Sequence, residues 1–170
     1  GWFYVYAKKI LNGQMIYKDF YAFLQPIYIY ILTFIAYISD YSFIALRNYG
    51  LLEQTILITL LFTLYQRATN ILNASIATIL TFMVYNTNTN DVIYSYYQLA
   101  LIFGLLSTLF LHNYFMKEKS LSLFLSGSFA GLSFLIKQSS GLIFIISFGI
   151  LLLLVLFNKN KISFKTLGLY

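Results

Sequence analysis

The chain has 170 residues, of which 60% are hydrophobic and 9% are charged, with a mean hydropathy of +0.78. Eleven Lys and Arg with five Asp and Glu are too few to cover a water-soluble domain, so the composition predicts one membrane-embedded, all-α domain over residues 1–170. The basic residues are scattered between apolar runs, which excludes a nucleic-acid patch and favours anionic lipid headgroups as partners. The absence of cysteine excludes disulfides, cysteine-ligated zinc and thiol chemistry.

The first forty residues mix aromatic and charged side chains with apolar ones, which is the composition of a membrane interface. A helix over residues 2–11 is expected to end before Gly13. Pro26 is a good first helical residue, but the apolar run 27–38 would reach only about 20 Å as a helix, short of a hydrocarbon core of roughly 30 Å. We therefore expect an N-terminal external loop (1–40) that carries interfacial juxtamembrane helices.

Longer apolar stretches follow, and each is expected to be a membrane-spanning helix of a polytopic bundle. They cover residues 44–66, 70–86, 94–115, 121–136 and 141–157. The polar connections alternate between basic and neutral, and the basic ones contain Arg67, Lys117, Lys119, Lys159 and Lys161. The positive-inside rule places the basic connections in the cytoplasm and the Asn-rich loop 86–91 and the Lys137 turn outside. We expect a multi-pass protein of the cell membrane.

The external loop contains an ordered series of residues: Tyr6-Ala7, Leu11-Asn12-Gly13, Tyr17-Lys18-Asp19 and Gln25-Pro26. Later in the chain, Ser42-Phe43 leads to Arg47, and Ala130-Gly131-Leu132 leads to Lys137. In this order the residues resemble the C-type glycosyltransferase superfamily, polytopic enzymes that include protein mannosyltransferases and aminoarabinose transferases. The resemblance implies transfer of a sugar from a polyprenyl-phosphate donor to a glycan, lipid or protein acceptor on the external face.

Two features depart from the family pattern. The acidic residue implicated in activating the acceptor is expected just upstream of Gly1, and both ends of the chain are expected to be those of a fragment. Several relatives have Lys before the Pro of the second juxtamembrane helix, where this chain has Gln25. Another cation would then have to meet the lipid phosphate.

Charge counting alone mildly favours a different topology. If residues 26–40 crossed the membrane, Lys8, Lys9 and Lys18 would join the other lysines in the cytoplasm, and Arg47 would lie outside. The short apolar length and the family pattern favour the interfacial helix instead.

Sugar transfer needs a carboxylate near the acceptor hydroxyl and a cation near the departing phosphate. We take Asp19 as the candidate catalytic residue, with a turn-capping role as the alternative. The candidate substrate-binding residues are Tyr17, Lys18, Gln25, Arg47, Lys137 and Gln138. For Lys137 the resemblance implies a phosphate contact, because the family has a Lys at this place, with an interfacial anchor as the alternative; the external side normally has few lysines. For Arg47 we favour the anchor, and Lys18 has headgroup contact as its alternative.

No metal site and no certain cofactor are expected, although Asn88, Asn90 and Asp91 could ligate a divalent cation or bind a sugar. A plain polar turn is the favoured interpretation of that loop, and His112 is expected to be an interface residue. The rival function is a transporter or channel subunit, for which Glu53 is the one hint. A noncatalytic membrane scaffold is the third alternative.

Overall fold

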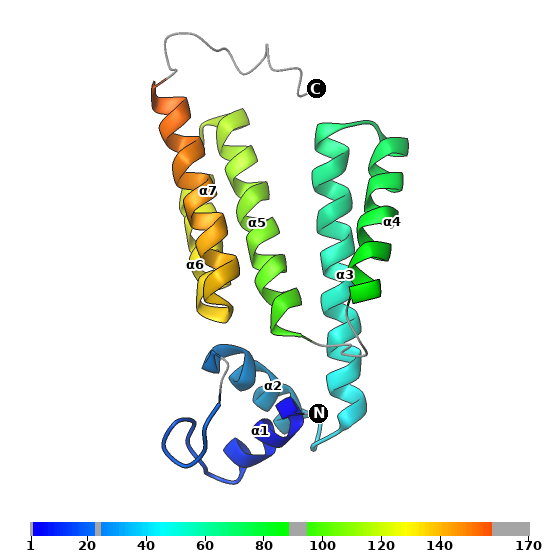
Figure 1. The fold of residues 1–170 in the computed structure, drawn as a ribbon, viewed down its shortest axis with the longest axis vertical. Helices are drawn as coiled ribbons and strands as arrows, with labels where there is room; N and C mark the ends of the chain where they lie inside the picture. The colour runs from blue at the N-terminus through cyan, green and yellow to red at the C-terminus, as the bar shows by residue number, and fades with distance from the viewer. Residues whose placement is uncertain (1, 23–24, 89–94, 158–170) are drawn as a thin grey trace.

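The computed structural model describes residues 2–22, 25–88 and 95–157, and this part of the chain is all-helical (Figure 1). The helices are α1 (Trp2–Leu11), α2 (Pro26–Ile38), α3 (Phe43–Ala68), α4 (Ile71–Asn88), α5 (Tyr96–Lys117), α6 (Ser120–Ile136) and α7 (Gln138–Phe157). The prediction of an all-α fold is confirmed for the described residues.

Helices α1 and α2 form a small layer at one end of the molecule, which in Figure 1 lies below α5, α6 and α7 and beside the first turns of α3. The chain reverses after α1 at Gly13, whose φ of 85° lies in the left-handed region that favours glycine. Pro26 opens α2 because its fixed φ suits the first helical turn. Apolar contacts among Tyr6, Ala22 and Ile29 join α1, the following loop and α2 into one layer.

Helices α3 to α7 run alternately up and down beside one another (Figure 1). Arg67, near the end of α3, donates a 2.6 Å hydrogen bond to Asn113 near the end of α5, so the C-terminal ends of these helices lie together. Lys137, between α6 and α7, contacts Tyr97 in the first turn of α5, which places it at the opposite end of the bundle. Each range expected to span the membrane contains one helix.

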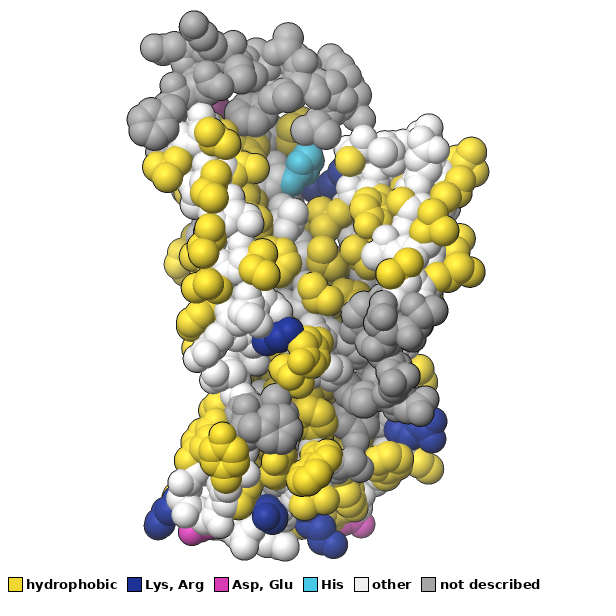
Figure 2. Space-filling view, in the orientation of Figure 1, with side chains coloured by type: hydrophobic (Ala, Val, Ile, Leu, Met, Phe, Trp, Pro, Cys, Tyr) yellow, Lys and Arg dark blue, Asp and Glu magenta, His cyan; other side chains and the backbone are white. Residues whose placement is uncertain are grey.

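Two helices in the described part of the chain are long and apolar enough to cross a membrane: α5 and the stretch Gln138–Val155 of α7. Shorter apolar helices occur at Pro26–Ile38, Ile71–Val84 and Ser120–Ile136. Large apolar side chains are exposed along α4 and α7, and Figure 2 shows hydrophobic surface over both helices. This distribution indicates membrane association, because a water-soluble protein rarely exposes such extensive apolar faces.

Helices α5 and α6 approach one another closely through small residues. The Ser107 hydroxyl donates to the Ser126 carbonyl oxygen at 2.6 Å, and the Ser126 hydroxyl donates to the Ser107 carbonyl oxygen at 2.9 Å. The Ser133 hydroxyl donates to the Ala100 carbonyl oxygen at 2.8 Å. These bonds join α5 to α6, and small side chains with interhelical hydrogen bonds are typical of packed membrane helices.

Candidate functional site

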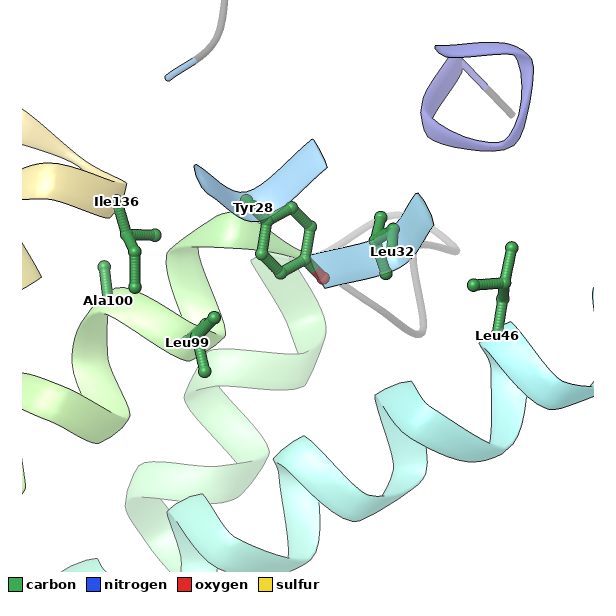
Figure 3. Close-up of a cluster of buried hydrophobic side chains, with 6 residues drawn as sticks. All are labelled: Tyr28, Leu32, Leu46, Leu99, Ala100 and Ile136. Atoms are coloured by element: carbon green, nitrogen blue, oxygen red, sulfur yellow. The ribbon is translucent and has the colours of Figure 1, made fainter. Parts of the chain in front are cut away.

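The end of the bundle meets the α1–α2 layer at a buried cluster drawn from four helices. Its fully or almost fully buried members are Tyr28, Leu32, Leu46, Leu99, Ala100 and Ile136. Figure 3 shows Tyr28 and Leu32 of α2 lying between side chains of α5 and α6 on one side and Leu46 of α3 on the other. Because the cluster includes residues from both layers, it fixes the α1–α2 layer against the ends of the longer helices.

A buried carboxylate lies beside this cluster. Glu53 of α3 is only 2% exposed, and its Oε2 accepts a 3.3 Å hydrogen bond from the hydroxyl of Tyr28, which is fully buried. Tyr49, one helical turn earlier, and the backbone of Ser95 also interact with this carboxylate. Burying a carboxylate is costly unless hydrogen bonds compensate, so these contacts explain how Glu53 is accommodated.

A row of aromatic rings leads from Tyr28 towards a lysine. The Tyr28 ring lies 5.4 Å from that of Phe3 and 6.4 Å from that of Tyr96, and the Tyr96 and Tyr97 rings are 4.1 Å apart between centroids. The Lys137 ammonium nitrogen lies 3.6 Å from the centroid of the Tyr97 ring. This cation–π geometry holds a half-buried positive charge at the junction of the two layers.

Asp19 lies elsewhere, in the loop between α1 and α2. Its side chain is exposed, and its Oδ2 accepts a 2.8 Å hydrogen bond from the backbone nitrogen of Met15. The neighbouring Tyr17 and Lys18 are also exposed, and Tyr17 has a φ of 67° within the same tight turn. The carboxylate therefore closes the turn that precedes it, and it remains accessible to a reactant.

The other candidate residues divide between the junction and the surface. Gln25 is the N-cap residue of α2, is partly buried, and makes no side-chain capping bond. Arg47, in the second turn of α3, is exposed, and so is Gln138 next to Lys137. Lys137 thus contacts the aromatic row, whereas Asp19 contacts the backbone of its own loop.

No group of three or more His, Asp or Glu side chains able to hold a metal ion occurs in the described ranges. The loop residues Asn90 and Asp91 lie outside those ranges, as does the side chain of Asn88. His112 is partly buried beside Asn113, which accepts the hydrogen bond from Arg67 at the other end of the bundle.

Sequence reasoning missed the partnership between Glu53 and Tyr28, and it missed Tyr96 and Tyr97 altogether. An acidic residue in an otherwise apolar helix was the available signal, since such residues usually mark a functional or buried polar site. No comparable signal distinguishes Tyr96 and Tyr97 from the other tyrosines of the chain, whose total is 16.

Over the residues that the structure describes, the chain is all-helical and has two helices suited to crossing a membrane. Comparisons with protein-family models, with curated proteins and with solved structures find no match to it.

Proposed function

We propose that this protein is a membrane glycosyltransferase that passes a sugar from a polyprenyl-phosphate donor to an acceptor on the external face. The observation that carries the proposal is the ammonium group of Lys137, held over the Tyr97 ring at the end of the bundle that meets the α1–α2 layer. A cation at this place can stabilise the phosphate that leaves with the lipid. The order of residues in the external loop, described above, supports the same function.

The proposal includes a polytopic arrangement in the cell membrane. Helices α3 to α7 each cross the bilayer, and the α1–α2 layer lies at the external interface. The alternation of helix direction supports this arrangement, because it puts Arg67, Lys117 and Lys119 at one end and Lys137 at the other. The donor's lipid tail would lie along the apolar outer faces of the bundle, with membrane lipids as its neighbours.

The aromatic row suits a donor of this kind. Its rings offer flat apolar faces to a sugar or an isoprenoid unit, and the nearby ammonium offers the charge for phosphate. In this scheme Lys137 contacts the donor, and Gln138 and Gln25 are polar groups near the same junction. Asp19, with Tyr17 and Lys18, faces solvent from the external loop, where its carboxylate accepts the proton of an acceptor hydroxyl.

The test is a transfer assay on the full-length protein with a panel of polyprenyl-phosphate sugars. Asp19→Asn should lower turnover about a hundredfold or more through loss of the base, because general-base catalysis contributes roughly 10²- to 10⁴-fold. The fold should persist because the Asn carbonyl oxygen can still accept from the Met15 nitrogen. Lys137→Met keeps the apolar stem and removes only the charge, so it should raise the donor KM as well as lower kcat.

Matched controls come from the same chain. Asp40→Asn changes another exposed carboxylate of the external loop, and Lys119→Met removes an exposed lysine at the opposite end of the bundle. Both control variants should retain wild-type rates. If the intact protein transfers none of the sugars, the proposed function is wrong; if Asp19→Asn and Lys137→Met both match their controls, the site assignment is wrong.

A transporter or channel subunit is the second candidate, and buried Glu53 is the observation that favours it. Solute or ion flux across proteoliposomes, lost on replacing Glu53, together with an absence of transferase activity would support this alternative. Noncatalytic scaffolding would show neither activity.

A further inference from the structure

Glu53 and Lys137 are joined by a continuous series of contacts across three helices. Glu53 accepts from the Tyr28 hydroxyl, the Tyr28 ring packs on Tyr96, Tyr96 packs on Tyr97, and Tyr97 carries the Lys137 ammonium. The Tyr28 hydroxyl lies 3.3 Å from Glu53 Oε2. The ring centroids are 6.4 Å apart for Tyr28 and Tyr96 and 4.1 Å apart for Tyr96 and Tyr97. Lys137 Nζ lies 3.6 Å from the Tyr97 centroid. Side chains in direct contact therefore connect the buried carboxylate to the lysine.

A second connection reaches the same place through the backbone. Ser95 is the N-cap residue of α5, and its hydroxyl accepts a 3.3 Å hydrogen bond from the Tyr97 nitrogen. The backbone of Ser95 interacts with the Glu53 carboxylate. The first backbone N–H groups of a helix have no partner within the helix, so an acceptor oxygen beside them is favourable. Glu53 thus contacts the residue that starts α5, and the next two residues are Tyr96 and Tyr97.

We propose that Glu53 is a positioning residue: by holding Tyr28 and Ser95 it fixes the first turn of α5, and so fixes the Tyr97 ring that orients Lys137. The proposal rests on the proposed function in one respect, namely that the ligand of Lys137 is the donor phosphate. Glu53 is 2% exposed, so its effect on the donor is exerted through these neighbours and not by direct contact.

The first arm of the test measures donor KM and kcat separately in the full-length protein. Glu53→Leu removes the acceptor and should raise the donor KM about five- to tenfold, the loss expected for one intramolecular hydrogen bond, with kcat changed less than about twofold. Glu53→Gln keeps an acceptor oxygen for Tyr28 and should restore the KM to within about twofold of wild type. An equal KM rise in both variants, or no rise in Glu53→Leu, overturns the proposal.

A double-mutant cycle distinguishes positioning from a general loss of stability. If Glu53 acts through Lys137, then Glu53→Leu should raise the KM far less in a Lys137→Met background than in wild type. Fully additive effects would overturn the proposal. Tyr28→Phe deletes only the hydroxyl and should raise the KM less than Glu53→Leu does. Tyr65→Phe is the control: it deletes a hydroxyl elsewhere on α3, which bonds Thr81 at 3.0 Å, and it should leave the KM unchanged.

The second arm needs no activity, so it separates failure of this proposal from failure of the proposed function. Amide hydrogen exchange in the first turn of α5 should accelerate about five- to tenfold in Glu53→Leu and Tyr28→Phe, as expected when one buried hydrogen bond is lost. Exchange there should stay at the wild-type rate in Tyr65→Phe. If the protein transfers no sugar but exchange accelerates as expected, Glu53 still positions α5, and only the donor phosphate is wrong as the ligand of Lys137. Unchanged exchange in both Glu53→Leu and Tyr28→Phe overturns the positioning role.

Discussion

Hydroxyl side chains in the apolar helices bond in two different ways. On α3, the Thr55, Thr59 and Thr63 hydroxyls each donate to the carbonyl oxygen four residues earlier in the same helix. On α5 and α6, Ser107 and Ser126 instead bond across the helix boundary, and both are buried. Only the second kind specifies which helices pack together, because the first kind is satisfied by an isolated helix.

The serine pair gives a prediction at this scale. Ser107→Ala and Ser126→Ala should each lower the free energy of unfolding by about 0.6 to 2 kcal/mol, the range known for interhelical hydrogen bonds in membrane helices. The double variant should lose less than the sum, because each change removes part of the same interaction. Reversible unfolding in mixed micelles measures these energies. Ser128→Ala is the control, since that exposed hydroxyl bonds only the Phe124 carbonyl oxygen of its own helix, and a comparable loss there would contradict the interhelical role.

Glycine has a specific role where α7 crosses α5. A Cβ added at Gly104 would overlap the ring of Phe144, whereas one added at Gly127 of α6 would meet no atom within 4 Å. Gly104→Ala should therefore destabilise the protein by about 1 to 3 kcal/mol through overpacking. Gly127→Ala should be neutral or slightly stabilising, because Ala is the better helix former. Thermal unfolding in one detergent compares the two, and equal midpoints would contradict the close approach of α7 to α5.

At the scale of elements, the helix ranges could be predicted because their limits depend on local chemistry. Gly13 and Pro26 bound the first loop, and Lys137 alone separates α6 from α7, with its φ and ψ of −148° and 105° outside the helical region. The contacts of the site could not be predicted in the same way. Tyr97 meets Lys137 only because α5 and α6 are antiparallel, and Glu53 meets Tyr28 only because α2 lies across the start of α3 and α5. Such pairings depend on tertiary packing, which periodicity does not encode.

At the scale of the whole molecule, the charge pattern and the short apolar length of α2 give opposite answers on whether this helix crosses the membrane. Helix α2 has 13 residues and packs on α1 in a layer at the end of the bundle, and it contributes Tyr28 and Leu32 to the junction. The helix begins at Pro26 and is followed by its C-cap residue Ser39, whose hydroxyl donates to the Ile35 carbonyl oxygen. Charged side chains gather over this end of the molecule in Figure 2, as expected at an aqueous interface.

This arrangement predicts which loops share a side of the membrane. Single cysteines replacing Lys18 and Ser139, both exposed, should react with an impermeant thiol reagent added to intact cells, because the α1–α2 loop and the α6–α7 turn lie at the same end of the bundle. A cysteine replacing Lys119, also exposed but at the opposite end, should react only after the membrane is permeabilised. Since residues 1–170 contain no cysteine, any label within this range reports the introduced cysteine. Labelling of positions 18 and 139 from opposite sides would mean that residues 26–40 cross the bilayer. If only position 119 is labelled from outside, the whole bundle has the opposite orientation.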